Sequence, residues 1–328
     1  MDRVQAITQD REMHDVSALL NLPLTRYRLR FDAGGAWRGA PESAWRGALG
    51  HALRKRVCVT RREACTDCLL AADCAFPLFF PAALPQRAER VEDTRITPYV
   101  LAASPADEAP AIVCTLIGPA LAHTAAILGS LADAAASGVG PGRGRLSLAD
   151  IAQELPVGSN CWSSTLSPSS SCLPIPPAVP PCVRLRFDTP LRLRRDNHCI
   201  TPAMLTFADL FTSLLRRASA LHAQSTGTVV SRDYRALVLA AREVRWKSTH
   251  LQWQESTRRS ERQQATMVLG GIVGDAALSG ADAQPFWPLL WLGQWLHAGK
   301  NASFGFGGFR LLGSAAIDCP GHEPALPR

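Results

Sequence analysis

Two segments of the chain alternate apolar and polar residues with the period of a β-strand that buries one face. These segments cover residues 24–31 and 183–188. Successive side chains of a strand point to opposite faces, so the alternation predicts two strands, each with one face on a core. Each of the two strands is expected to open its own half of the chain.

The elements expected after the first strand follow a regular order. We predict a helix over residues 43–57, an apolar strand over 111–117, a second helix over 119–136 and a glycine-rich turn over 138–144. The first helix is predicted from an apolar face that recurs at about 100° per residue. That face consists of Trp45, Ala48, Leu49, Ala52 and Leu53.

The second half repeats this order. A helix is expected over residues 205–222, strand-like segments over 237–274, a Trp-rich helix over 285–298 and a glycine-rich turn over 299–308. A final strand then ends at Leu312. Each half therefore has the element order of a βαββαβ unit. We predict an α+β fold of two tandem ferredoxin-like (RRM-like) domains.

The chain changes composition between the two halves. Residues 156–182 are rich in Pro and Ser, which favour neither a helix nor a central strand. We interpret this segment as a linker. It would separate an amino-terminal domain, 1–155, with a cysteine-cluster insertion, from a carboxyl-terminal domain, 183–328, with a glycine-rich loop. A length of 328 residues also suits two domains.

The composition narrows the class of protein. Hydrophobic residues make up 47% and charged residues 19%, which is typical of globular domains. Lys and Arg number 35 against 28 Asp and Glu, giving a net charge of +7. Only Lys55, Lys247 and Lys300 are lysines. Because arginine makes planar two-point contacts with phosphate, this balance favours a polyanionic partner.

Neither a secretory signal nor a membrane partner is expected. Residues 1–15 hold several charged side chains and no apolar core. The most apolar long run, 111–136, is broken by Gly118 and Pro119 and contains His123 and Asp133. We therefore expect a soluble, cytoplasmic protein.

Ten cysteines in a cytoplasmic protein favour free thiols or a metal site over disulfides. Cys58, Cys65, Cys68 and Cys74 form a cluster whose inner pair has the C-x-x-C spacing of a zinc knuckle. We predict a structural zinc there, with an iron–sulfur cluster or plain reduced thiols as alternatives. The other cysteines show no ligand spacing.

Several segments resemble one protein family. In the carboxyl-terminal half these are 207–221, 259–263, 269–274, 285–290 and 297–307, the last reading HAGKNASFGFG. In the amino-terminal half they are 45–51, the cysteine cluster and 76–79. Together they resemble the CRISPR repeat-processing endoribonucleases of the RAMP superfamily, whose members have paired ferredoxin-like domains.

The resemblance implies an enzyme that binds CRISPR repeat RNA and cuts it once without a metal cofactor. The ribose 2′-OH attacks the adjacent phosphate and leaves 2′,3′-cyclic phosphate and 5′-OH ends. Catalytic residues differ between members of this family, so the site is argued from the residues of this chain.

The first helix offers the catalytic candidates. His51 and Lys55 are four residues apart and lie on the flank of its apolar face. His51 suits proton transfer near neutral pH, and Lys55 suits a phosphate whose charge grows. Tyr27, on the preceding strand, is a further candidate for orienting the cut or donating a proton. The alternative is that His51 and Lys55 are ordinary exposed residues.

RNA contacts are expected from the glycine loops and from a basic strip. In the loops the candidates are Arg143, Gly299, Lys300, Gly305 and Gly307, since glycine lets a backbone approach phosphate closely. In the strip they are Arg258, Arg259 and Arg262, with Trp246 and Trp253 nearby. The alternatives are tight turns and a solvated sheet face.

Two other classes of function are also compatible with the sequence. The RAMP superfamily also supplies RNA-binding subunits of CRISPR effector complexes that do not cut, and other effector subunits would then be partners. A zinc-dependent nucleic-acid-binding regulator is the third class. The chain has no P-loop, zinc-protease or nucleophile-elbow motif and no carboxylate cluster of a two-metal nuclease.

Overall fold

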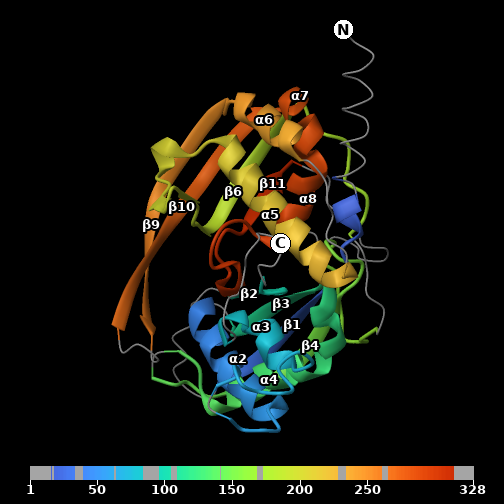
Figure 1. Ribbon diagram of the computed structural model, residues 1–328, viewed down its shortest axis with the longest axis vertical. Helices are drawn as coiled ribbons and strands as arrows, with labels where there is room; N and C mark the ends of the chain where they lie inside the picture. Colours follow the sequence, from blue (N-terminus) through green and yellow to red (C-terminus); the bar gives the residue numbers. More distant parts are fainter. Residues whose placement is uncertain are drawn as a thin grey trace, which may run out of the picture.

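The computed structural model contains two domains, which lie one above the other in Figure 1. Each domain is a sheet with helices against one face. The described residues are 16, 18–33, 40–62, 64–83, 96–104, 109–140, 142–167, 173–227, 234–260 and 265–313.

The amino-terminal sheet has the strand order β2-β3-β1-β4-β5, and neighbouring strands run antiparallel. Its strands are β1 (Leu24–Ala33), β2 (Tyr99–Ala103), β3 (Ala111–Ile117), β4 (Leu146–Glu154) and β5 (Trp162–Ser163). Its helices are α2 (Glu42–Val57), α3 (Ala75–Phe79) and α4 (Thr124–Ser137). Short 3-10 turns are η1 (Leu19–Asn21), η2 (Pro81–Ala83) and η4 (Gly118–His123).

The carboxyl-terminal sheet has the order β11-β6-β10-β9, also antiparallel. Its strands are β6 (Cys182–Leu191), β9 (Ser248–Ser260), β10 (Ala265–Ser279) and β11 (Phe309–Leu312), with a separate pair β7 (Arg194–Arg195) and β8 (His198–Cys199). Its helices are α5 (Phe207–Thr226), α6 (Arg235–Glu243), α7 (Gly280–Ala283) and α8 (Trp287–Leu296). Its 3-10 turns are η5 (Pro202–Met204), η6 (Gln284–Phe286) and η7 (Ala302–Phe304).

Both sheets follow one topology. In each, the first strand of the unit lies between the third and the fourth, and the second strand of the unit pairs with the third. This is the arrangement of a ferredoxin-like βαββαβ unit. The predicted α+β fold of two tandem ferredoxin-like domains is confirmed.

The packing of α2 on the amino-terminal sheet follows from the sequence pattern. Alternation along β1 sends Leu29 and Phe31 to the helix side, where α2 supplies Trp45, Leu49 and Leu53. The rings of Phe31 and Trp45 stack at 5.2 Å. Burial of each such side chain contributes roughly 1.5–3 kcal/mol. These contacts fix which face of α2 points to solvent.

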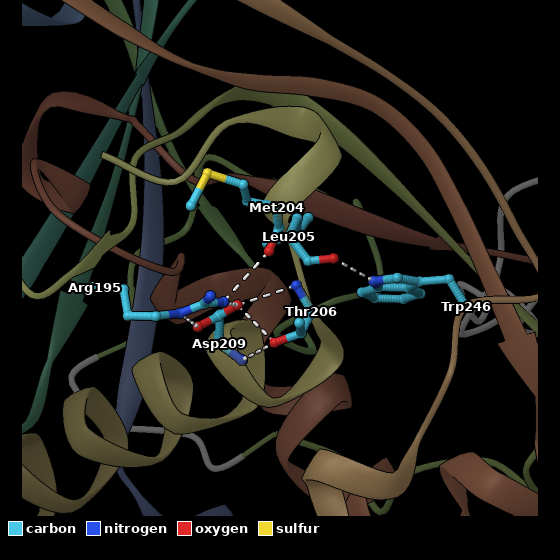
Figure 2. A network of polar contacts seen from close by, with 6 residues as sticks. All are labelled: Arg195, Met204, Leu205, Thr206, Asp209 and Trp246. Carbon is cyan, nitrogen blue, oxygen red and sulfur yellow. Dashed lines mark hydrogen bonds and ion pairs between the residues drawn. The ribbon is translucent and has the colours of Figure 1, made fainter. Parts of the chain in front are cut away.

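Helix α5 begins with a capping box, shown in Figure 2. The Asp209 N–H donates to the Thr206 hydroxyl at 3.3 Å, and the Thr206 N–H donates to the Asp209 carboxylate at 3.0 Å. Arg195 forms an ion pair with that carboxylate, and the Trp246 indole N–H donates to the Leu205 carbonyl at 3.1 Å. The network fixes the start of α5 and holds β7 and the chain before β9 against it.

Strands β9 and β10 extend beyond the rest of their sheet. β10 pairs with β6 only between Ile272 and Ser279, whereas its pairing with β9 continues to Ala265. Residues 254–260 and 265–271 therefore form a two-stranded arm, the β9–β10 arm. In Figure 1 it runs from the carboxyl-terminal domain down one side of the molecule, toward the level of the other domain.

The two domains share apolar and polar contacts. Leu24 and Val100 of the first sheet belong to the core cluster of the carboxyl-terminal domain. Arg217 of α5 is buried at this junction, and its Nε donates to the Leu296 carbonyl at 2.6 Å and its Nη2 to the Thr97 carbonyl at 3.4 Å. Burial lowers the pKa of Arg217 to about 10.

The prediction of strand-like structure over residues 237–274 is wrong at its start. α6 occupies Arg235–Glu243 because Leu237 and Ala241 recur at helical spacing, and both are buried in the core. The apolar run there belongs to a short amphipathic helix.

Residues of the Pro- and Ser-rich segment contact both domains. Trp162 and Ser163 form β5 at the edge of the first sheet. Leu173 is buried, and the Trp287 indole N–H donates to the Pro177 carbonyl at 2.6 Å.

Within the described part of the chain, no helix is long and apolar enough to cross a membrane.

Candidate nucleic-acid interface

Helix α2 presents His51 and Lys55 to solvent. Each stands two positions after a buried leucine, Leu49 or Leu53, and is therefore about 200° around the helix from the core stripe. Both side chains are exposed, and four residues separate them, so they are neighbours on one helix face. The sequence placed them on the flank of the apolar face, and the structure places them opposite it.

Tyr27 lies on the other side of α2, within the core. Its side chain is 5% exposed and belongs to the cluster that contains Leu49 and Leu53. Burial raises its pKa, and a hydrogen bond with Thr124 opposes that rise in part. The structure does not bring Tyr27 to the surface where His51 and Lys55 lie. Its burial favours a packing role.

The second glycine loop uses its own amide groups inside the protein. The N–H of Gly299 donates to Ser213 Oγ at 2.8 Å, and the N–H of Gly307 donates to the Pro190 carbonyl at 3.0 Å. Gly305 has a φ of 80° and Gly307 a φ of 70°, values that favour glycine. These amides are not free to bind phosphate as the structure stands.

Lys300 belongs to the same loop and, unlike the glycines, carries a charged side chain. Its backbone N–H donates to the Arg192 carbonyl at 2.9 Å, while the ammonium-bearing side chain is exposed. The loop therefore offers phosphate a lysine side chain rather than a row of amides.

The second glycine loop docks on the helix that carries His51. The Arg46 guanidinium lies between two rings, 4.8 Å from that of Phe80 and 4.8 Å from that of Phe304. Gly305 abuts Glu42 and the Leu101 carbonyl so closely that a Cβ would lie 2.7 Å from that oxygen. Burial raises the pKa of Glu42.

The β9–β10 arm contacts this junction as well. Leu269 of the arm forms a small buried cluster with Phe304 and Phe306 of the loop. Arg258 and Arg259 lie on β9 within the arm, opposite Met267 and Thr266, and Arg262 falls outside the described residues. Arm, glycine loop and α2 thus form one continuous set of contacts.

The first glycine loop is at a different place. Arg143 is exposed in it, with a φ of 50°, and its N–H donates to the Gly140 carbonyl at 3.1 Å. The loop joins α4 to β4 within the amino-terminal domain.

Sequence reasoning missed an arginine row on the first sheet. Arg26, Arg28 and Arg30 lie on the face of β1 opposite the core. Arg26 pairs with Glu154 at 2.8 Å, and the guanidinium of Arg28 lies 4.6 Å from the ring of Trp162. Burial, followed by repulsion from Arg30, lowers the pKa of Arg28. Arginine at every second position of the alternating segment was the available signal.

His297, directly after α8, has an unusual backbone. Its φ of 61° and ψ of 157° fall where glycine is normally found. Its Nδ1–H donates to the Phe306 carbonyl at 3.2 Å. Burial lowers the pKa of His297 to about 4, and the charges of Arg217 and Arg26 act in the same direction. The ring is therefore neutral near pH 7.

The predicted zinc cysteines are neighbours but are not gathered as ligands. Burial raises the pKa of the Cys65 thiol, Arg54 opposes this, and charges at Cys74, Cys58 and Cys68 add to the rise. Among the described residues, no three His, Cys, Asp or Glu side chains are arranged to hold a metal ion.

The expectation of free thiols is wrong for Cys161, which is disulfide-bonded.

Two family models match consecutive parts of the chain. Residues 185–309 match the model of the CRISPR-associated endoribonuclease Cas6, and residues 22–170 match a model described as an N-terminal domain, AF_1859_N. No curated protein matches the chain.

Solved structures with a similar fold include two of the Thermus thermophilus Cas6 protein TTHB231. In a product complex it is 17% identical, with 88% of this chain and 99% of that chain covered and a TM-score of 0.55. Its other structure is 15% identical, with 89% and 99% covered and a TM-score of 0.54. A Cas6 (TTHA0078) product complex is 16% identical, with 88% and 98% covered and a TM-score of 0.50. At these identities the likeness shows the fold.

Proposed function

We propose that this chain, whose residues 185–309 match the Cas6 model, acts as a CRISPR-associated endoribonuclease that binds the repeat RNA of a CRISPR array and cuts it without a metal cofactor. The observation that carries the proposal is the exposed pair of His51 and Lys55 on α2. It combines an imidazole that can transfer protons with a basic side chain at one spot on the surface.

The proposed reaction uses the RNA's own nucleophile. His51 takes the proton from a ribose 2′-OH, whose oxygen attacks the adjacent phosphorus. The bond from phosphorus to the 5′ oxygen breaks, and that oxygen takes a proton from water at the exposed helix face. Lys55 stabilises the phosphate oxygens as their negative charge grows. The products are a 2′,3′-cyclic phosphate and a 5′-OH.

Tyr27 is left out of this proposed reaction. A hydroxyl buried under α2 meets no substrate unless the helix moves, so we assign Tyr27 to the core. A Tyr27→Phe variant should keep its cleavage rate, whereas a tyrosine that donates a proton would lose it.

The proposed RNA path runs along basic groups near the domain junction. Lys300 is exposed on the second glycine loop, and Arg258 and Arg259 belong to the β9–β10 arm that contacts the same loop. Phosphate pairing by such groups releases counterions, so binding should weaken as salt rises. Repeat RNA should bind more tightly than scrambled RNA at each salt level.

The experiment uses the full chain with labelled repeat RNA in EDTA. Cleavage with a 2′,3′-cyclic phosphate end is the expected result, and a 2′-deoxy nucleotide just upstream of the cut should block it while binding persists. Cleavage of the 2′-deoxy substrate, or activity only with added divalent metal, would overturn the mechanism.

The second candidate is a repeat-RNA-binding subunit of a CRISPR effector complex that does not cut. The docking of the second glycine loop on the other domain favours this binding function, because the loop then holds the domains together rather than acting on RNA. Tight, repeat-specific binding with no cleavage over long incubation would establish this second function in place of the first.

A further inference from the structure

The segment between α2 and α3, residues 58–74, has no helix or strand among its described residues. Val59 is 78% exposed and Leu69 is 95% exposed, so the segment buries little apolar surface of its own. Its internal backbone bonds include a turn in which the Cys68 N–H donates to the Cys65 carbonyl at 3.3 Å. Apolar packing alone gives little to offset the entropy of ordering such a segment.

The four cysteines of this segment surround one hollow. Cys58, Cys65, Cys68 and Cys74 all line a cavity of about 360 Å³, and all four are free and partly exposed. The Thr60 hydroxyl lies 3.8 Å from Cys58 Sγ and 3.6 Å from Cys68 Sγ, so these two sulfurs flank a common point. Because the described thiols are not gathered as a ligand set, a bound ion requires the segment to contract around it.

Arg62 lines this hollow, and Arg54 contacts Arg62 beside it. Arg54 donates to the Arg62 carbonyl, and the Arg62 guanidinium donates to the Asp67 carbonyl at 3.1 Å. Four thiolates around Zn²⁺ leave a net charge of −2, and nearby arginines stabilise that charge. Thiolates select soft metal ions rather than Mg²⁺ or Ca²⁺.

We propose that Cys58, Cys65, Cys68 and Cys74 bind one Zn²⁺ in a closed tetrahedral site. Each thiol loses its proton to solvent as the metal binds, and the contracted segment brings each sulfur to about 2.3 Å from the ion. The site begins where α2 ends, since the Cys58 N–H donates to the Arg54 carbonyl at 3.0 Å. The metal therefore anchors the carboxyl end of the helix whose exposed face carries His51 and Lys55.

The test is elemental analysis of the full chain purified without added metal. About one zinc per chain is expected. The double variant Cys65→Ser/Cys68→Ser should lose it, while the control Cys182→Ser, at an exposed free thiol outside the segment, should keep it. Folded wild-type protein without zinc, or a double variant that retains all of it, would overturn the proposal.

If the double variant fails to fold, the site can be tested on the wild-type protein instead. Wild-type protein loaded with Co²⁺ should show the charge-transfer absorption of thiolate ligands, and a mercurial titrant that modifies the cysteines of the segment should release the metal. A cobalt spectrum without thiolate absorption would contradict the site. Iron with inorganic sulfide in the purified protein would replace zinc by an iron–sulfur cluster and overturn the zinc assignment.

Discussion

The two glycine loops stand at equivalent places in two ferredoxin-like units, yet their surroundings are opposite. In the first loop, Gly142 is exposed, and a Cβ there would meet nothing within 4 Å. In the second loop, a Cβ on Gly307 would lie 1.8 Å from the Ala298 carbonyl oxygen, and Gly305 abuts the other domain. The two units share one topology, but neighbouring backbone approaches the two loops differently.

This difference assigns distinct physical roles to similar sequences. The second loop is rich in glycine because its backbone approaches the Ala298 carbonyl, β2 and α2 too closely for side chains. The first loop needs glycine for its own turn. Gly142 has a φ of 77° in open space, and a Cβ on Gly138 would lie 2.5 Å from the Arg143 carbonyl oxygen of the same loop. Glycine content alone therefore does not identify a phosphate-binding loop.

Alanine substitution should separate the two loops most strongly. Gly307→Ala should lower the free energy of unfolding by about 4 kcal/mol, because the new Cβ collides with backbone and the φ of 70° is unfavourable. Gly142→Ala meets only the backbone strain and should cost about 1 kcal/mol. Denaturant unfolding of both variants measures the difference, and equal losses would contradict the comparison.

His297, just before the second loop, should make the stability of the protein sensitive to acid. The folded-state pKa of His297 is about 4, below its ordinary value of 6.5. A lowered pKa in a base means that the unfolded state binds more protons, so stability rises with pH between about 4 and 6.5 and levels off above. The gain should be about 2 kcal/mol, allowing for the partial exposure of the ring.

The variant His297→Gln should remove most of this pH dependence, measured as the free energy of unfolding from pH 4 to 7. His51→Gln is the matched control, since His51 is exposed on α2. An unchanged slope in His297→Gln would show that the ring titrates normally in the folded protein.

The smallest expected effect concerns docking of the second loop. A double-mutant cycle of Arg46→Met and Phe304→Leu should give a coupling energy of about 1 kcal/mol, because the guanidinium lies 4.8 Å from the Phe304 ring across the domain junction. The pair Arg54 and Phe76, at 5.6 Å within one domain, is the control and should couple less. No coupling between Arg46 and Phe304 would mean that the loop is held by its glycines alone.

The sequence predicted the local elements better than the contacts between them. The strand at 111–117 has the expected bounds, because it is an almost continuous apolar run, and α2 begins one residue earlier than predicted, because Trp45, Leu49 and Leu53 recur at helical spacing. The helix α6 was mistaken for a strand although its buried residues recur at helical spacing, because only nine residues carry that pattern.

The sequence also predicted the local features of the candidate site better than its long-range contacts. Helical spacing predicted that His51 and Lys55 are neighbours, although they lie opposite the core rather than on its flank. The burial of Tyr27 against Thr124, and the docking of Gly305 on Leu101 and Glu42, depend on residues far apart in the sequence. No local pattern reports such contacts.

The most direct test of the account is single-turnover cleavage of repeat RNA in EDTA by His51→Ala, with His198→Ala as the exposed-histidine control in the other domain. We predict that His51→Ala slows the cut by about 10²–10⁴-fold while RNA affinity stays close to that of the wild type, because only proton transfer is lost. His198→Ala should cut at the wild-type rate. Cleavage by His51→Ala at the wild-type rate would contradict the account.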